Sequence, residues 1–257
     1  MKLAILGSGS RGNSIFVETD SEKILIDVGF SGKKVEEQLL KIGEKINEIK
    51  AILITHEHGD HILGAGIISR KYKIPIYITK ESYEVGILKL GKINKEYIHF
   101  IEKDFWIGDT GIYPFDVMHD AERTIGFRIE ESTGSKACIA TDIGYVDNVV
   151  REAFKEVDVM VIESNYDYTK LMECSYPWEL KSRVKSRTGH LSNIDAARFI
   201  VENYHSQLKK VYLVHMSKDS NNPKIALDTV REELEKNKVE IPIEIAYQDI
   251  CTDLLEF

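Results

Sequence analysis

The most informative segment of this sequence is seven residues long and reads Thr55-His56-Glu57-His58-Gly59-Asp60-His61. It directly follows an apolar run that is typical of a buried strand, Ala51-Ile52-Leu53-Ile54. Imidazole and carboxylate groups bind metal ions, and four side chains of the segment are candidate ligands: His56, His58, Asp60 and His61. A lone histidine is usually structural, but this concentration of ligand groups at a strand end predicts a metal site.

The spacing of these residues predicts two metal positions. His56 and His58 lie two residues apart, so in an extended segment they point the same way and can grip one ion. Asp60 and His61 are adjacent where a helix is expected to begin, and they can reach a second ion. The helical H-E-x-x-H zinc motif is excluded, because it needs a histidine at position 60. Imidazole and carboxylate ligands suit Zn²⁺, Mn²⁺ or Fe.

The pattern His-x-His-x-Asp-His after an apolar strand resembles the signature of the metallo-β-lactamase superfamily. That family draws its remaining ligands from later strand ends in the order His, Asp, His, and this chain offers His119, Asp142 and His215. The resemblance implies that one metal is held by His56, His58 and His119, the other by Asp60, His61 and His215, and that Asp142 bridges them. It also implies the fold, an α/β (α+β) chain forming a four-layer αββα sandwich.

Two further features narrow the function within this superfamily. The flavodiiron oxygen reductases resemble the motif but carry Glu at the place of His58, so the histidine favours a hydrolase. The segment Gly189-His190-Leu191-Ser192-Asn193 resembles an element of ribonuclease Z whose histidine assists phosphodiester cleavage. The resemblance therefore implies a catalytic role for His190.

Together with Glu163-Ser164-Asn165 and Tyr176-Pro177-Trp178-Glu179-Leu180-Lys181, this element resembles the YycJ (WalJ) branch, described as 5′-to-3′ exonucleases acting on DNA. The chain departs from it at Tyr166, where a histidine is expected. The implied chemistry is phosphodiester hydrolysis by a hydroxide that bridges two metals, with Asp60 orienting its proton and His190 donating one to the leaving oxygen. A thioester or lactone hydrolase on the same core remains the alternative.

The glycine-rich segment Gly7-Ser8-Gly9-Ser10-Arg11-Gly12 matches a dinucleotide fingerprint, but a strand-like run from Ser14 to Thr19 follows it instead of a helix. A phosphate-binding P-loop also fails, because Asn13 stands where its lysine must be. We expect a tight hairpin. If that loop borders the active site, its backbone N–H groups could face a substrate phosphate, so Ser8 and Asn13 are predicted substrate contacts. Asn165 is a further predicted substrate contact.

A basic stretch runs from Lys181 to Arg187 just before His190. On a helix Lys181 and Lys185 would share a face, and so would Arg183 and Arg187. We predict that Lys181 and Lys185 contact a polyanionic substrate; the alternative is a solvated helix face.

Composition sets the remaining limits. The chain has 257 residues, a net charge of -8 and 43% hydrophobic residues, which suits a globular protein and argues against one that coats nucleic acid. We expect a single domain over residues 1–257, with no room between Asp142 and His215 for the inserted domain of the β-CASP nucleases. No apolar run is long enough to span a membrane. The three cysteines form no C-x-x-C pair, which fits a cytoplasmic protein. The oligomeric state stays open.

Hydrophobic patterning predicts strands first and a mixed order later. The expected strands are 2–6, 14–19, 23–28, 51–55, 76–79, 112–117, 125–129, 137–141, 157–162 and 211–214, with a last one closing the chain. The expected helices cover 31–42, about 60–72, a segment from about 177, 192–204 and a segment from 223.

Overall fold

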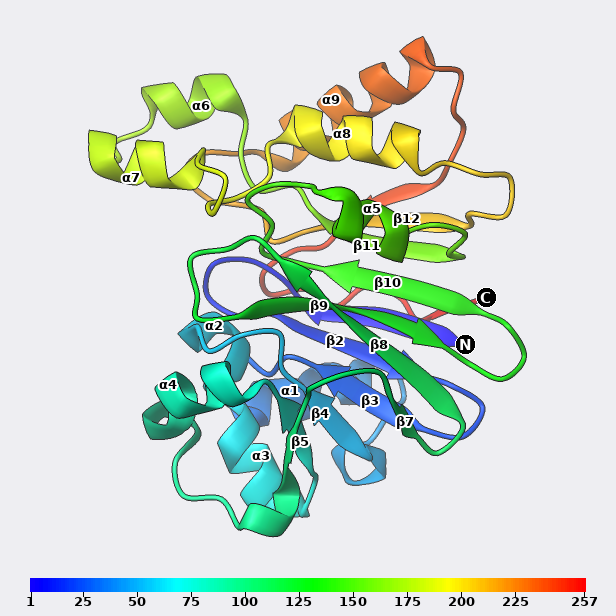
Figure 1. Ribbon diagram of the computed structural model, residues 1–257. Coiled ribbons are helices and arrows are strands. Elements are labelled where there is room, and N and C mark those ends of the chain that lie inside the picture. The colour runs from blue at the N-terminus through cyan, green and yellow to red at the C-terminus, as the bar shows by residue number, and fades with distance from the viewer.

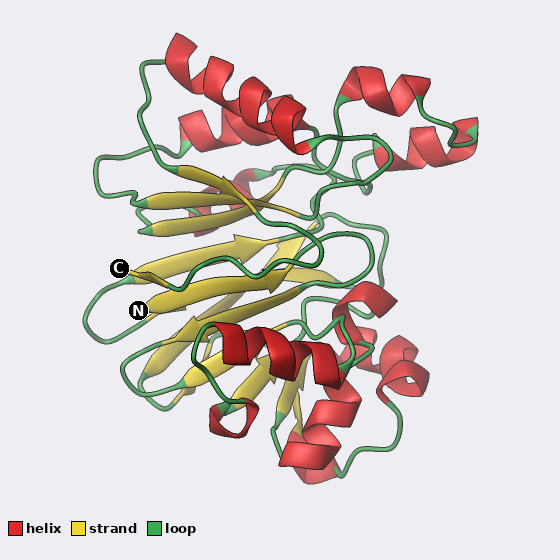
Figure 2. Ribbon diagram, turned by 180° about the vertical axis from the view of Figure 1, so that it is seen from behind, coloured by secondary structure: helices red, strands yellow, loops and turns green.

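The computed structural model describes residues 1–257 as four layers, in which two β-sheets pack face to face between two layers of helices (Figure 1). Figure 2 shows the same arrangement from behind, with helices outside and strands inside. The predicted αββα sandwich is therefore confirmed. None of the helices combines the length and the apolar character needed to cross a membrane.

The first sheet has seven strands and is built almost entirely from the N-terminal part of the chain. Its inner strands β1 to β3 pair antiparallel, and β3 to β6 pair parallel. In spatial order the strands are β14 (Leu255–Glu256), β1 (Lys2–Gly7), β2 (Ser14–Glu18), β3 (Lys23–Ile26), β4 (Ala51–Leu53), β5 (Ile76–Ile78) and β6 (Ile98–Phe100).

The second sheet also has seven strands, with an antiparallel half from β7 to β10 and a parallel half from β10 to β13. In spatial order they are β13 (Ile243–Ile245), β12 (Lys210–Val214), β11 (Val159–Glu163), β10 (Lys136–Ala140), β9 (Thr124–Glu130), β8 (Thr110–Val117) and β7 (Phe105–Ile107). Parallel halves of this kind need covering on both faces, and the helices cover the outer face while the other sheet covers the inner face.

Helices cover the outer face of each sheet (Figure 1). Those on the first sheet are α1 (Gly32–Lys41), α2 (Gly59–Ile62), α3 (Ala65–Tyr72) and α4 (Lys80–Leu90). Those on the second sheet are α5 (Asn148–Ala153), α8 (Asn193–Glu202) and α9 (Pro223–Lys236), while α6 (Tyr168–Glu173) and α7 (Trp178–Val184) project to one side. Two short 3₁₀ turns, η1 (Ile46–Glu48) and η2 (Lys95–Tyr97), complete the set.

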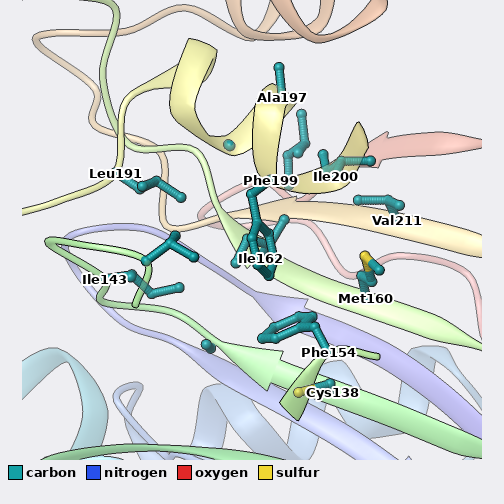
Figure 3. Close-up of a cluster of buried hydrophobic side chains, with 14 of the residues drawn as sticks. Cys138, Ile143, Phe154, Met160, Ile162, Leu191, Ala197, Phe199, Ile200 and Val211 are labelled. Atoms are coloured by element: carbon teal, nitrogen blue, oxygen red, sulfur yellow. The ribbon is translucent and has the colours of Figure 1, made fainter. Parts of the chain in front are cut away.

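Three large hydrophobic clusters hold the layers together. One lies between the sheets and takes side chains from both, for example Ile5, Phe127 and Tyr212. The second packs the first sheet against its helices. The third packs the second sheet against α5, α8 and α9; Figure 3 shows Phe154 and Phe199 of this cluster, whose rings meet edge to face with centroids 5.0 Å apart.

The structure differs from the sequence-based expectation after the histidine motif. The single helix predicted over about 60–72 is two helices, α2 and α3, because the Gly64 N–H leaves the helical pattern and donates to the Val28 carbonyl, 2.8 Å away. Helix α4 and the short elements β6, β7, α5 and α6 were not predicted. The chain end also differs: β13 closes the second sheet and β14 returns to the first, beside β1.

The loop after β3 and the loop before β2 hold the histidine motif through main-chain hydrogen bonds. The Val28 N–H donates to the His61 carbonyl at 2.8 Å, and the Asn13 N–H donates to the Asp60 carbonyl at 2.8 Å. Gly29 lies where these segments meet, and a Cβ there would stand 1.7 Å from the Asp60 carbonyl oxygen. Only glycine allows this close approach.

Gly29→Ala should therefore destabilise the protein, because the loops would have to separate. We expect a loss of about 2–3 kcal/mol in the free energy of unfolding, the upper part of the overpacking range, measured by urea denaturation. Gly32→Ala is the matched control, since its added Cβ would meet nothing closer than an Ile68 side-chain carbon at 3.4 Å. Equal midpoints for the two variants would show that the loops are not held this closely.

Candidate metal centre

All seven predicted ligand residues gather at one edge of the sandwich, just beyond the ends of strands β4, β8, β10 and β12. Their ligand atoms fall into three overlapping groups, each within 4.8 Å. The groups are His56 with His58 and His119; Asp60 with His61 and His215; and His56 with His61 and Asp142. The first two groups contain the same residues as the two ligand sets that the family resemblance implied, so the geometry is compatible with that prediction.

The first histidine group is oriented by bonds on the ring atoms that face away from it. Nδ1 of the fully buried His56 lies 3.0 Å from Thr55 Oγ1, and Nδ1 of His119 lies 3.0 Å from the Gly189 carbonyl oxygen. His119 Nε2 lies 3.4 Å from His58 Nδ1, while His56 Nε2 is buried with no hydrogen-bond partner. A buried ring nitrogen without a partner is costly, and a metal ion would satisfy it.

Asp27 orients the second group, although the sequence analysis did not select it. Its Oδ2 lies 2.7 Å from His61 Nδ1, and its two oxygens also accept the Thr55 N–H and hydroxyl, each at 2.9 Å. His61 therefore directs Nε2 toward Asp60, with 3.5 Å to Oδ2. The sequence did hold a signal for Asp27, because it is an acidic residue that directly follows β3. Strand β3 is the parallel neighbour of β4, and parallel strands end at the same edge of a sheet, so Asp27 had to lie near the histidine motif.

Asp142 lies between the two groups. It is buried, its Oδ2 is 3.1 Å from His61 Nε2, and its Oδ1 is 3.6 Å from His119 Nε2. Oδ2 has no hydrogen-bond partner. One carboxylate with an oxygen facing each group fits the bridging position.

His215 occupies a strained backbone conformation, with φ of 52°. Its N–H donates to Ser8 Oγ at 2.8 Å, and its carbonyl accepts from Asn165 Nδ2 at 2.8 Å. Its ring is held as well, with Nδ1 2.7 Å from Glu163 Oε1 and Nε2 3.4 Å from Asp60 Oδ2. Polar contacts at both ends thus hold this residue in its strained position.

Three predicted substrate contacts, Ser8, Asn13 and Asn165, are buried beneath the site. Besides its bond to His215, Ser8 donates to Asn13 Oδ1 at 2.8 Å. Asn13 Nδ2 lies 3.2 Å from the Gly9 carbonyl oxygen and 3.1 Å from His61 Nε2. These bonds favour a supporting role for the three side chains, which position the ligand residues from below.

Glu163, another residue that the ligand prediction omitted, holds His190. Its Oε1 lies 2.8 Å from His190 Nδ1, and its Oε2 accepts the Ile143 and Leu191 N–H groups, each at 2.9 Å. Counting His215 Nδ1, the Glu163 carboxylate has four nitrogen partners. Glu163, His190, His215 and Asp142 are close enough to hold a metal, but the carboxylate lone pairs are already committed. We therefore assign this group as a hydrogen-bond network that leaves His190 Nε2 free.

The basic stretch is arranged differently from the predicted helix face. Helix α7 ends at Val184, so Arg187 lies beyond it and shares no helical face with Arg183. Lys181 Nζ donates to the Met172 carbonyl at 2.6 Å, and Arg183 pairs with Asp120. Lys185, in contrast, lines a cavity together with His190. Of the predicted pair, only Lys185 faces the neighbourhood of the site.

The electrostatics of the centre show competition between protons and cations for the same lone pairs. Burial lowers the pKa of His56 well below its ordinary value. Burial opposes charge on His61 too, but the carboxylates of Asp27 and Asp142 raise its pKa well above the ordinary value. Burial is likewise outweighed at His215, where Asp142 and its neighbours raise the pKa to about 10. Metal binding must displace such protons, so metal affinity falls as pH falls.

The family model described as the beta-lactamase superfamily domain matches residues 22–216. The chain belongs to the metallo-β-lactamase superfamily. Within the superfamily it is similar to the exodeoxyribonuclease WalJ of Streptococcus pneumoniae serotype 2, with 36% identity over 98% of this chain and 95% of that protein. It is also similar to the exodeoxyribonuclease YycJ of Bacillus anthracis, with 34% identity over 92% of this chain and 90% of that protein. The resemblance to the YycJ (WalJ) branch is therefore confirmed.

Solved structures of the superfamily share this fold along nearly the whole chain. The metallo-β-lactamase fold protein YhfI from Bacillus subtilis superposes with a TM-score of 0.69 at 16% identity, covering 98% of both chains. The short form of human tRNase Z gives a TM-score of 0.65 at 18% identity, again covering 98% of both. The fold together with the His and Asp groups at its edge indicates a protein that binds divalent metal ions.

Asp27→Asn should weaken metal binding, because an amide cannot hold the His61 ring as the carboxylate does. We expect metal affinity to fall about 10- to 100-fold, measured by competition with a chromophoric chelator. Asp158→Asn is the control: that carboxylate also accepts a main-chain N–H, from Lys136 at 2.8 Å, but belongs to none of the ligand groups. Unchanged affinity in Asp27→Asn would remove Asp27 from the centre.

Proposed function

We propose that this protein is a dimetal phosphodiesterase that degrades nucleic acid, specifically a DNA exonuclease working in the 5′-to-3′ direction. One observation carries the proposal: His190 stands beside a complete set of metal ligands, its Nδ1 held by Glu163 and its Nε2 free. The relatives that match nearly the whole chain are named exodeoxyribonucleases, which supports both nuclease activity and DNA as the substrate.

We assign two divalent cations to the centre. The histidine-rich ligand set suits Zn²⁺ or Mn²⁺, and Fe would also fit. When bound, the two ions lower the pKa of a water nucleophile and neutralise charge on the phosphoryl group. One would be held by His56, His58 and His119 and the other by Asp60, His61 and His215, with Asp142 between them.

The other chemistry comes from side chains of the chain itself. Since Glu163 accepts from His190 Nδ1, the opposite nitrogen, Nε2, is the atom that gives a proton to the leaving oxygen. Glu163 also stabilises the charged imidazolium: burial opposes the charge, but this carboxylate raises the pKa of His190. Asp60 keeps 23% of its side chain exposed, so we assign it to orient the proton of the attacking water.

A thioester or lactone hydrolase on the same core is less well supported. An uncharged ester substrate gives no task to a held proton donor beside the metals, nor to the cations that border His190. We further propose that the chain acts as one domain in the cytoplasm. The central cluster draws on both sheets, and Cys138, Cys174 and Cys251 are all free thiols, as expected in a reducing compartment.

His58→Ala should abolish hydrolysis while the fold is kept, because this residue lies beyond the end of β4 and outside the hydrophobic core. Metal content should fall from two equivalents to about one, measured by elemental analysis, and the circular dichroism spectrum should not change. His99→Ala is the control, since that ring stacks on Tyr77 at a centroid distance of 4.7 Å and belongs to no ligand group. Substantial activity in His58→Ala would show that its assignment is wrong.

His190→Ala should keep both metals but lower turnover of DNA about 10²- to 10⁴-fold, the usual range for a general acid. The loss should be smaller for a nitrophenyl phosphodiester, whose leaving group needs no proton. The measurement is kcat for both substrates in wild type and variant. An equal loss on both would rule out proton donation, and loss of a metal would make His190 a ligand.

A further inference from the structure

A cavity of about 400 Å³ opens beside His190, on the side of the second sheet's helices. Its walls are the loop after β10, from Gly144 to Val146, the segment between α7 and His190, and the partly exposed side of α8 that carries Asp195, Arg198 and Glu202; Arg151 of α5 also lines it. This volume lies within the range of small-ligand sites. Because 19% of the His190 side chain remains exposed, the cavity and the metal centre share this residue.

The cavity is basic in an otherwise acidic protein. Two of its cations are compensated: Arg151 pairs with Glu202 at 3.1 Å, and Arg198 lies 3.9 Å from Asp195.

The other two, Lys185 and Arg187, also line the cavity, and neither has an acidic partner within 4.0 Å. Each lies over an aromatic ring: Lys185 Nζ is 5.0 Å from the centroid of Trp178, and the Arg187 guanidinium carbon is 4.1 Å from that of Tyr145. Two unpaired cations supported by aromatic rings are suited to an anionic ligand.

The main chain that carries these two cations is held beside His190 by close packing. A Cβ on Gly144 would stand 2.4 Å from the Arg187 carbonyl oxygen, so the two loops touch through their main chains. The His190 N–H donates to the Val184 carbonyl at 2.8 Å, which closes the segment that carries Lys185. A ligand held by these cations would therefore lie in the cavity that His190 also lines.

We propose that this cavity binds the terminal phosphate of the nucleic-acid strand, with Lys185 and Arg187 as its phosphate ligands. The inference rests on the proposed nuclease function and adds how a strand end is recognised. A phosphate monoester carries more charge than an internal linkage, and the guanidinium fork matches its oxygens. A strand anchored by its end would present its first linkages to the metal centre.

The test compares oligodeoxynucleotides that are identical except for a 5′-phosphate, a 3′-phosphate or hydroxyl ends. Binding is measured with phosphorothioate linkages, which resist cleavage, and kcat/KM with ordinary linkages. We expect the 5′-phosphorylated strand, whose end a 5′-to-3′ exonuclease attacks first, to bind about tenfold or more tightly than the hydroxyl-ended strand, as charge-assisted hydrogen bonds allow. Tighter binding of the 3′-phosphorylated strand would contradict the direction proposed above.

Arg187→Gln and Lys185→Gln should each bring this preference close to one, and Arg187→Lys should retain part of it. Lys236→Gln is the control and should keep the full preference, because that lysine lies on α9 beside Glu233 and outside the cavity. Equal binding of all three strands by the wild type, or a preference that survives both glutamine variants, would overturn the inference. If the preference in binding is present but the wild type hydrolyses no phosphodiester, the proposed function fails and the cavity assignment stands.

Discussion

The structure depends on burying many imidazole and carboxylate groups within a few ångströms of one another. Burying these groups costs folding free energy unless each lone pair and each charge has a partner. Two carboxylates outside the ligand set meet this need. Asp27 holds His61 and the Thr55 main chain from the first sheet, while Glu163 holds His190 and His215 from the second. As a result, Nε2 of His61 and Nε2 of His215 both face Asp60, at 3.5 Å and 3.4 Å from its Oδ2.

These two carboxylates explain why the fold and the chemistry are inseparable. Asp27 follows β3 and Glu163 ends β11, so each belongs to a different sheet. The packing of the sheets against each other therefore sets the distance between the site residues that come from the first sheet and those that come from the second. Asp142 lies between the two histidine groups. The cavity beside His190 is tied to the metal centre in the same way, because the loop that carries its cations packs on the loop that carries Asp142.

The sandwich and the seven proposed ligands could be predicted because the local motif at residues 55–61 resembles that of a known superfamily, and that resemblance pointed to His119, Asp142 and His215 near later strand ends. The sequence did not predict Asp27 or Glu163 as site residues, since a single acid at a strand end has no distinctive spacing. The start of α3 and the end of α7 were also not predicted. Helix α3 starts anew because of a hydrogen bond to distant Val28, and α7 ends before Arg187, neither of which a periodic pattern reveals.

The most direct test of the central claim is to locate the metals by anomalous diffraction from crystals soaked with Mn²⁺ or Zn²⁺. The account predicts two peaks about 3.5–4 Å apart, with Asp142 contacting both and His190 contacting neither. A single peak, or an ion bound by Glu163, His190 and His215, would contradict it.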